Sequence, residues 1–342
     1  SDLIDSMNKI VSDISKFDII TEPIEKFTMR LEDKINNFLR KLKNVGVFTQ
    51  EILTKLHVSG SAPGVLYGLP KIHKADFCTK FQYRPIFAAF STPSFKLAKF
   101  LVPILHPLTI NEYTCSNSFQ FVKDITGLND SNKYCMASFD IENLFTNIPL
   151  SETIEICLNK LFSNPIYNTL GLTRQVFKGL LELAVMHCFF LFNGKYYKQK
   201  DGLGMGLPLG PTFANIFMCF HETTWLDNCP ADFKPVFYRR YIDDTFLLFR
   251  HQSHVQKFLT FLNAQHCNIN FTCELENNCR ISFLDCSILR ENNRFECSVF
   301  RKSTFTGLGT SFYSFCEFRF KLNRSEERRV GKECRSRWSP YH

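Results

Sequence analysis

Three aspartates are the residues of this sequence best suited to metal-dependent chemistry. Asp243 and Asp244 are adjacent within the apolar run RRYIDDTFLLF (239–249), and Asp140 directly follows the run YCMASF (134–139). Carboxylates that lie together repel one another, and their pKa rises unless a cation is present. Oxygen ligands without nearby His or Cys favour Mg²⁺, which binds one or two carboxylates together with phosphate oxygens. Two such ions about 4 Å apart would stabilise the attacking and leaving oxygens of phosphoryl transfer.

The flanking segments predict how these carboxylates could meet. The run 134–139 is typical of a buried strand that presents Asp140 at its end, and 239–249 predicts a strand, a tight turn and a second strand. If these strands are neighbours, the three side chains converge. Each acid taken alone has a plainer interpretation, because Asp-Asp is common at hairpin turns and an aspartate after a strand can cap a helix.

The rest of the chain mixes helical and strand patterns and predicts an α+β fold, a sheet layered with helices. Residues 1–58 carry apolar side chains at helical spacing, which predicts an N-terminal helical region. The pair Asn193-Gly194 between two apolar strands indicates a hairpin. Further helices are expected at 92–108, near Pro149, and at 173–189, 212–226 and 254–264, and further strands at 65–90, 269–273 and 281–289.

Composition excludes several classes of protein. Of the 342 residues 44% are hydrophobic, which is enough for a large core and argues against wholesale disorder. No apolar run reaches the length of about 18 residues that a membrane span needs, and the N-terminal sequence lacks a signal-peptide pattern. The 14 cysteines are scattered without a CxxC pair. This favours reduced thiols in an intracellular protein over disulfides or a zinc site.

The last residues, RSEERRVGKECRSRWSPYH (324–342), do not continue the preceding pattern. Back-translated, they resemble a short-read sequencing adapter, so we expect this tail to be non-native and the natural protein to continue differently beyond Asn323. The tail holds six Arg or Lys and three Glu, and so carries three of the eight net positive charges. A basic tail that binds nucleic acid is the alternative interpretation.

Seven motifs, in order along the chain, resemble those of reverse transcriptases, and most of all those of Penelope-like retroelements. A related RPI motif also marks telomerase reverse transcriptases. The seven are YGLPKIHK (67–74), RPI (84–86), SFDIENLFTNIPL (138–150), GMGLPLGPTFANIFM (204–218), RRYIDDTFLLF (239–249), ISFLDCSIL (281–289) and FRKSTFTG (300–307).

This resemblance implies a right-hand polymerase fold of fingers, palm and partial thumb, preceded by the N-terminal helices. It implies a reverse transcriptase domain at 59–323, with the thumb starting near residue 291. The implied function is the RNA-directed DNA polymerase of a retrotransposon, in which a primer 3′-hydroxyl attacks the α-phosphate of a dNTP. The implied partners are an RNA template, a DNA primer and dNTP. The implied cofactor is a pair of Mg²⁺ ions, which Mn²⁺ could replace, and the implied location is nuclear. No GIY-YIG motif is visible, so nuclease activity is not predicted.

The resemblance also implies roles for individual residues. Asp140 and Asp243 would bind both metal ions together with the carbonyl oxygen of Ile141. Asp244 would lie beside them and has a weaker claim to direct ligation. Tyr241 would pack near the primer end.

Other matching residues would bind the incoming nucleotide. Phe145 falls at the sugar-gate position, where its ring would clash with a ribose 2′-hydroxyl; the alternative is one more core residue among 37 Phe. Lys71 and Arg84 would hold the triphosphate, because arginine grips phosphate bidentately and lysine acts as a point charge. Lys74 is a weaker candidate. A solvated basic face is the alternative for all three basic residues.

The glycine-rich loop before the helix at 212–226 would face the template base and the nucleotide. Gly206, Pro208 and Gly210 would shape it, since glycine lets the backbone approach a ligand closely. An ordinary flexible loop is the alternative. Leu207 and Leu209 depart from the residues usual in such enzymes, which puts substrate handling in question rather than the fold.

A further set of basic residues is predicted to contact nucleic-acid phosphates through salt-dependent electrostatics. These are Lys234, Arg239, Arg240, Arg301 and Lys302. Asp285, in an LD dipeptide, is expected to have a structural role. The main alternative to an active polymerase is a catalytically inactive remnant that only binds nucleic acid. A related RNA-dependent RNA polymerase is disfavoured by Phe145.

Overall fold

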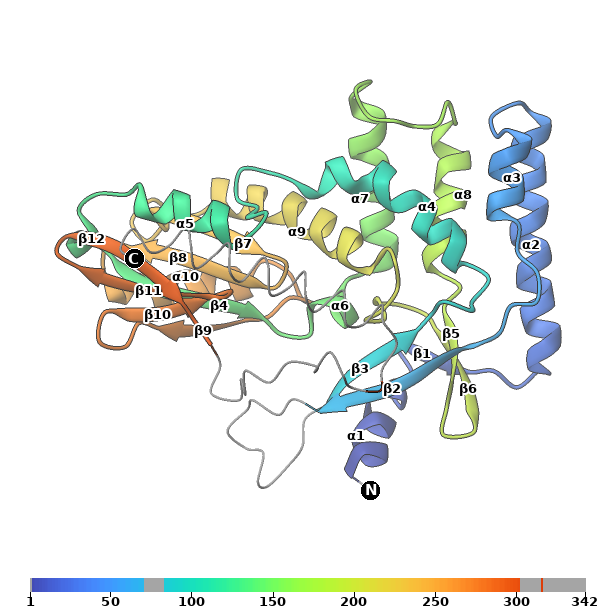
Figure 1. Ribbon diagram of the computed structural model, residues 1–342, viewed down its shortest axis with the longest axis horizontal. Helices are drawn as coiled ribbons and strands as arrows, with labels where there is room; N and C mark the ends of the chain where they lie inside the picture. The colour runs from blue at the N-terminus through green and yellow to red at the C-terminus, as the bar shows by residue number, and fades with distance from the viewer. Residues whose placement is uncertain (1, 71–82, 302–314, 316–342) are drawn as a thin grey trace.

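The computed structural model describes residues 2–70, 83–301 and 315 of the chain, which form an α+β fold with three sheets (Figure 1). The helices are α1 (Asp2–Val11), α2 (Ile24–Asn44), α3 (Gln50–Leu56), α4 (Phe95–Leu105), α5 (Ser118–Thr126), α6 (Leu144–Asn147), α7 (Leu150–Ser163), α8 (Arg174–Val185), α9 (Gly210–Asp227) and α10 (Gln252–Asn263). The strands are β1 (Phe17–Ile19), β2 (Gly64–Pro70), β3 (Tyr83–Ala88), β4 (Cys135–Ile141), β5 (Phe189–Phe192), β6 (Lys195–Gln199), β7 (Phe237–Tyr241), β8 (Asp244–Phe249), β9 (Phe271–Leu275), β10 (Arg280–Phe283), β11 (Cys286–Glu291) and β12 (Arg294–Val299).

The five-stranded sheet has the order β1-β6-β5-β2-β3 and gathers strands from distant parts of the chain. The predicted hairpin at Asn193-Gly194 joins β5 to β6, and both turn residues have the positive φ of a type I′ turn, 46° and 73°. Strand β1 pairs with β6, and α1 packs against β2 and β3. The region 1–58, expected to be helical, holds α1, α2 and α3, and in addition the short strand β1, which belongs to this sheet.

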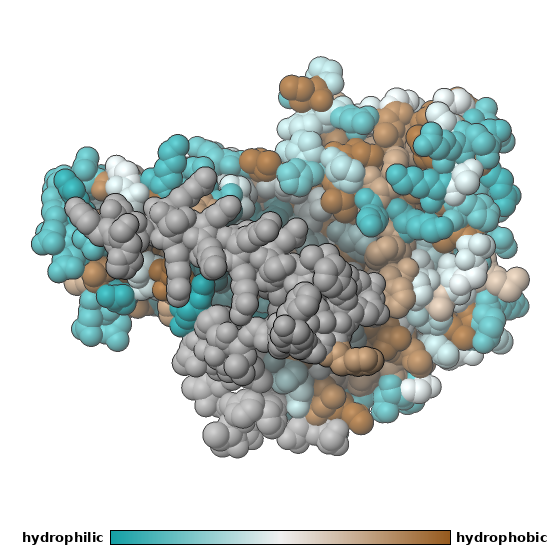
Figure 2. Space-filling model, in the orientation of Figure 1, coloured by the Kyte–Doolittle hydropathy of each residue, from teal (hydrophilic) through white to brown (hydrophobic). Residues whose placement is uncertain are grey.

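Helix α2 confirms the helical spacing expected near the N-terminus. Its apolar positions Leu31, Ile35 and Leu39 are buried. On the face shown in Figure 2, hydrophilic residues predominate on the outer side of α2 and α3, at the right of the view. The pair therefore buries one stripe and exposes the other, as an amphipathic helix does at a protein surface.

The central sheet, β7-β8-β4-β9, is antiparallel throughout and is buried on both faces. On one face Phe139 packs against Phe258 of α10, with ring centroids 6.0 Å apart. On the other face Phe246 packs against Phe121 of α5 and Phe283 of β10, at 5.1 and 5.8 Å. A strand covered on both sides needs apolar residues at successive positions, which explains the unbroken run TFLLF in β8.

The three-stranded sheet β10-β11-β12 differs from the sequence prediction. The single strand expected at 281–289 is two strands, because the chain reverses at Leu284-Asp285, where Leu284 has a φ of 54°. The Phe300 N–H donates to the main-chain carbonyl oxygen of Asp285 at 2.7 Å, and the structural role expected for the Asp285 side chain stays a prediction. Strand β12 was not predicted, although Phe295, Cys297 and Val299 alternate with polar residues along it in the pattern of a strand.

Two further observations concern the described residues as a whole. None of the helices in those ranges is long and apolar enough to cross a membrane. Cysteines of the described ranges such as Cys157, Cys188 and Cys219 are free thiols. The tail at 324–342 and most of the expected thumb lie outside the described residues.

Candidate active site

The β7–β8 hairpin carries two of the three aspartates. Tyr241 pairs with Asp244 across it, which leaves Ile242 and Asp243 as the two turn residues. Ile242 has a φ of 58°, in the left-handed region that costs a residue of this kind about 1–3 kcal/mol. The surrounding structure must therefore hold this turn in its strained shape.

The third aspartate lies on the neighbouring strand. Asp140 is directly opposite Asp244 in the antiparallel register of β4 and β8. Such partners have Cα atoms about 4.5–5.5 Å apart and side chains on the same face of the sheet. The Ile141 N–H also donates to the carbonyl oxygen of Asp243 at 3.2 Å. The structure thus brings the three predicted aspartates to one end of the β4–β8 pair.

The electrostatics of the site suit a cation. Asp140 is exposed, whereas Asp243 and Asp244 are half-buried. Burial raises the pKa of Asp243, and the positive charge of Arg84 on β3 opposes that rise. The three carboxylates do not form a set whose ligand atoms all lie within 4.8 Å.

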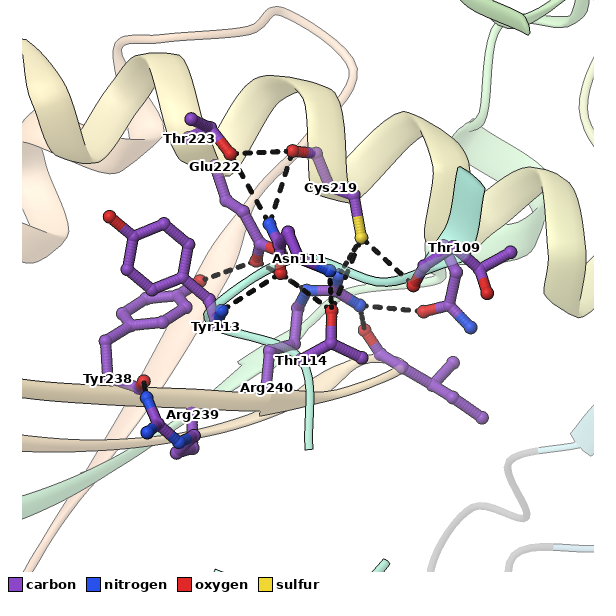
Figure 3. Close-up of polar contacts among 12 residues, drawn as sticks. Thr109, Asn111, Tyr113, Thr114, Cys219, Glu222, Thr223, Tyr238, Arg239 and Arg240 are labelled. Atoms are coloured by element: carbon purple, nitrogen blue, oxygen red, sulfur yellow. Dashed lines mark hydrogen bonds and ion pairs between the residues drawn. The ribbon is translucent and has the colours of Figure 1, made fainter. Parts of the chain in front are cut away.

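A buried network lies directly beneath the turn (Figure 3). Arg240 is fully buried and forms a bidentate ion pair with Glu222 of α9, at 2.6 Å from Nε to Oε2 and 2.9 Å from Nη2 to Oε1. Its Nη1 donates to Asn215 Oδ1 at 2.8 Å and to the carbonyl oxygen of Ile242 at 3.0 Å. The prediction that Arg240 contacts nucleic-acid phosphates is therefore wrong, because its guanidinium is enclosed and already paired.

Arg239 also differs from its predicted role. Its Nε donates to Asp124 Oδ2 at 2.8 Å, and its guanidinium lies over the ring of Phe237 at 4.9 Å. This partly buried arrangement already occupies the guanidinium, so the predicted phosphate contact is not supported. Lys234 and Arg301 are exposed and remain predictions. Lys302 lies outside the described residues.

The loop before α9 packs against both the five-stranded sheet and α6. The Phe87 N–H of β3 donates to the Met205 carbonyl oxygen at 2.7 Å, and the Leu203 N–H donates to the Phe145 carbonyl oxygen at 2.8 Å. A Cβ on Gly206 would lie 2.2 Å from the Phe87 carbonyl oxygen. Glycine is thus required at this position by contact with the protein's own backbone, and not only by approach to a ligand as predicted.

The other predicted loop residues lie beside this contact. Gly210 is the first residue of α9, and a Cβ there would be 3.8 Å from the ring of Phe145. Pro208 is half-buried. Leu207 and Leu209, the two departures from the usual pattern, are only 7% and 1% exposed and belong to the core. Their side chains point inward, so the departures do not alter an exposed polar surface.

The remaining predicted residues are less closely gathered. Tyr241 is 37% exposed at the end of β7, beside the aspartates. Arg84 is exposed on β3, opposite Leu69 of β2. Lys71 and Lys74 lie outside the described residues. The side chain of Ile141 is buried, so only its main-chain atoms can serve the site.

Sequence reasoning missed the partners of Arg240. Glu222 is 1% exposed and also accepts hydrogen bonds from Asn111 Nδ2 at 2.8 Å and from the Tyr238 hydroxyl at 3.4 Å. One signal was present: Glu222 and Asn215 are polar residues seven positions apart on a helix rich in apolar residues, and so share one helical face. A carboxylate buried on that face requires a buried cationic or hydrogen-bonding partner.

A second ionisable cluster joins α7, α9 and the segment after α10. Glu152 binds His221 Nε2 through Oε1 at 2.8 Å and His266 Nε2 through Oε2 at 3.2 Å. Their ligand atoms are close enough to hold a metal. However, the Asn268 N–H donates to His266 Nδ1 at 3.1 Å, so Nδ1 is an acceptor and Nε2 is the nitrogen that donates to Glu152. Metal-bound histidines usually donate from their other nitrogen, so this cluster suits a hydrogen-bonded link between helices.

Comparison with known families decides which class of protein this is. The model of the family described as reverse transcriptase (RNA-dependent DNA polymerase) matches residues 72–279, more than half of the chain. The chain belongs to the reverse transcriptase family. The matched range contains the three aspartates, the glycine-rich loop and Arg84 of this reverse transcriptase. No curated protein matches its sequence.

Solved telomerase structures share the fold of this reverse transcriptase. Apo telomerase from Candida tropicalis, truncated from its C-terminal domain, superposes with a TM-score of 0.54 at 11% identity, over 86% of this chain and 59% of the telomerase. Telomerase from Candida albicans, in complex with a fragment of telomeric RNA, gives 0.52 at 12% identity, over 81% and 51%. The reverse transcriptase therefore has the right-hand polymerase fold, and it spans little more than half the length of these telomerases.

Proposed function

We propose that this chain catalyses RNA-directed DNA synthesis by extending a DNA primer with dNTPs on an RNA template. One observation carries the proposal: the register that sets Asp140 opposite Asp244, with the turn residue Asp243 bonded to the Ile141 N–H. Membership of the reverse transcriptase family supports the same reaction. The order of the seven motifs supports an origin in a Penelope-like retrotransposon, whose copying would take place in the nucleus.

The donors at the site fit a pair of Mg²⁺ ions. Asp140, Asp243 and the Ile141 carbonyl would hold them, with Asp244 beside them. Every donor is an oxygen, the ligand type that Mg²⁺ prefers, and burial raises the pKa of Asp243 in a way that a bound cation would reverse. When bound, the ions would supply charge stabilisation for the attacking and leaving oxygens. Mn²⁺ could take the same place.

The chain's own side chains would bind and select the nucleotide. Arg84 would grip the triphosphate, since its charge already acts on Asp243 from β3. Lys71, outside the described residues, is proposed for the same role. Phe145, whose ring lies beside Gly210, would exclude a ribose 2′-hydroxyl. Tyr241 would contact the primer end, from which the 3′-hydroxyl attacks the α-phosphate and displaces pyrophosphate.

The test is primer extension by the full chain on an RNA template with Mg²⁺, in which dNTPs and rNTPs are compared. We expect extension with dNTPs, little with rNTPs, and loss of extension in the Asp243→Ala variant. Asp285→Asn is a matched control, because Asp285 lies at the β10–β11 turn, and it should extend primers normally. Failure to extend while nucleic-acid binding persists would support the inactive remnant instead.

A further inference from the structure

Arg240 links the helix α9 to the catalytic turn through a single rigid side chain. Through Nε and Nη2, its guanidinium donates to both carboxylate oxygens of Glu222. Through Nη1, the same guanidinium donates to the carbonyl oxygen of Ile242, the residue immediately before Asp243. The main chain of Arg240 is also fixed, since its N–H donates to the Tyr113 carbonyl oxygen at 2.9 Å and its carbonyl oxygen accepts from the Cys115 N–H at 2.8 Å.

Stability alone does not account for this arrangement. A buried ion pair loses the hydration of both charges, and apolar residues of similar volume often stabilise a protein as well or better. Here, moreover, every carboxylate oxygen of Glu222 is satisfied, by Arg240, Asn111 and Tyr238. A fully satisfied buried network favours one defined geometry, which is what a site that gathers carboxylates needs.

The hydrogen bond from Arg240 acts on the strained turn at Ile242 and Asp243. Ile242 is held at a φ of 58°, which an isoleucine would leave if it were free to do so. The contact from Nη1 fixes the orientation of the peptide group between Ile242 and Asp243. That peptide orientation sets the direction in which the Asp243 side chain leaves the backbone.

We propose that Arg240, anchored by Glu222, is a positioning residue that holds the strained turn so that Asp243 faces Asp140. This inference rests on the proposed function for its effect on catalysis. Arg240 is fully buried and its guanidinium is already paired, so it would act only through the turn. Its loss should therefore lower kcat and weaken divalent-ion binding, while KM for dNTP changes little.

The test uses the Arg240→Lys variant, which keeps the charge but cannot reach both Glu222 and the Ile242 carbonyl as a planar fork does. We expect kcat in primer extension to fall about tenfold or more, with KM for dNTP within about threefold of wild type. Arg239→Lys is the matched control. It makes the same change in the neighbouring ion pair with Asp124, away from the turn, and should keep kcat within about twofold of wild type.

A second variant applies if Arg240→Lys does not fold. Asn215→Ala removes the other acceptor of the same Nη1, and we expect kcat to fall about threefold at unchanged KM. The proposal would be overturned if kcat of either variant equalled that of wild type. It would also be overturned if Arg239→Lys lowered kcat by the same factor.

A readout that needs no catalysis separates this proposal from the proposed function. Mn²⁺ binding, measured by electron paramagnetic resonance without nucleotide or nucleic acid, should be about tenfold weaker in Arg240→Lys and unchanged in Arg239→Lys. If the wild-type chain does not extend primers, the proposed function fails, and these Mn²⁺ affinities alone decide the role of Arg240. Equal affinities in all three proteins would overturn that role.

Discussion

Replacing Gly206 by alanine tests how tightly the loop before α9 is packed on the five-stranded sheet. A Cβ there would lie 2.2 Å from the carbonyl oxygen of Phe87 and 3.2 Å from its carbonyl carbon. The φ of 115° at Gly206 is also one that residues with a side chain rarely adopt. The neighbouring backbone cannot retreat cheaply, because the Phe87 N–H is bonded to the Met205 carbonyl oxygen at 2.7 Å.

The steric clash and the positive φ both contribute to the expected loss of stability in Gly206→Ala. An unfavourable positive φ costs about 1–2 kcal/mol, and forced overpacking costs about 1–3 kcal/mol. The free energy of unfolding of Gly206→Ala should therefore fall by roughly 2–5 kcal/mol, measured as a lower urea midpoint at unchanged m-value.

Gly210→Ala is the matched control for this measurement. A Cβ at Gly210 would meet nothing closer than the Gly204 carbonyl oxygen at 3.6 Å, so its stability should stay within about 0.5 kcal/mol of wild type. If Gly206→Ala and Gly210→Ala unfold at the same urea concentration, the packing of this loop on β3 has been misjudged.

Three further outcomes follow from the described contacts. Phe145→Val should raise the incorporation of rNTPs relative to dNTPs by roughly tenfold or more, because the ring no longer blocks the 2′-hydroxyl; competitive primer extension measures the ratio, and an unchanged ratio argues against a sugar gate. Glu222→Gln should lower the free energy of unfolding by about 3–5 kcal/mol, because it leaves the buried charge of Arg240 unmatched. Thermal and urea unfolding measure this loss. The control is Asp124→Asn in the partly exposed Arg239–Asp124 pair, and an equally small loss in both variants would contradict the prediction. Burial raises the pKa of Asp243 in the folded state, so its protonated form stabilises the fold below the ordinary pKa of 3.8 and this stabilisation is lost as pH rises through the folded pKa. Asp243→Asn should therefore be more stable than wild type at pH 7 without divalent ions, with the gain fading in acid, and a gain that grows on acidification would reverse this reasoning.

The sequence was sufficient to predict those elements that depend on neighbouring residues alone. The hairpin at Asn193-Gly194 forms because those residues accept positive φ, and β4 and the β7–β8 hairpin form where continuous apolar runs are buried on both faces. The convergence of Asp140 with Asp243 and Asp244 could also be predicted, because it requires only that β4 and β8 be neighbours.

Long-range pairing could not be read from the sequence in the same way. From the sequence alone, Arg239 and Arg240 were both expected to contact phosphates. However, side chains alternate between the two faces of β7, which places Arg240 in the interior. There it pairs with Glu222 of the mostly apolar helix α9. The turn at Leu284 was missed because leucine is seldom found at positive φ, and β1 was missed because three residues carry too short a pattern. The misses at Arg240 and β1 depend on partners distant in sequence, Glu222 and β6.

The order of strands in the five-stranded sheet has a consequence for the smallest piece of this protein that could be produced alone. A fragment cut at the borders of the family match, 72–279, would lack β2, which lies between β5 and β3. It would also lack β1, which covers the edge of β6, and the whole sheet β10-β11-β12, from which Phe283 packs against the central sheet. Unpaired strand edges of this kind promote aggregation. The region recognisable by homology is therefore narrower than the cooperative folding unit, and expression boundaries should be drawn from the sheet.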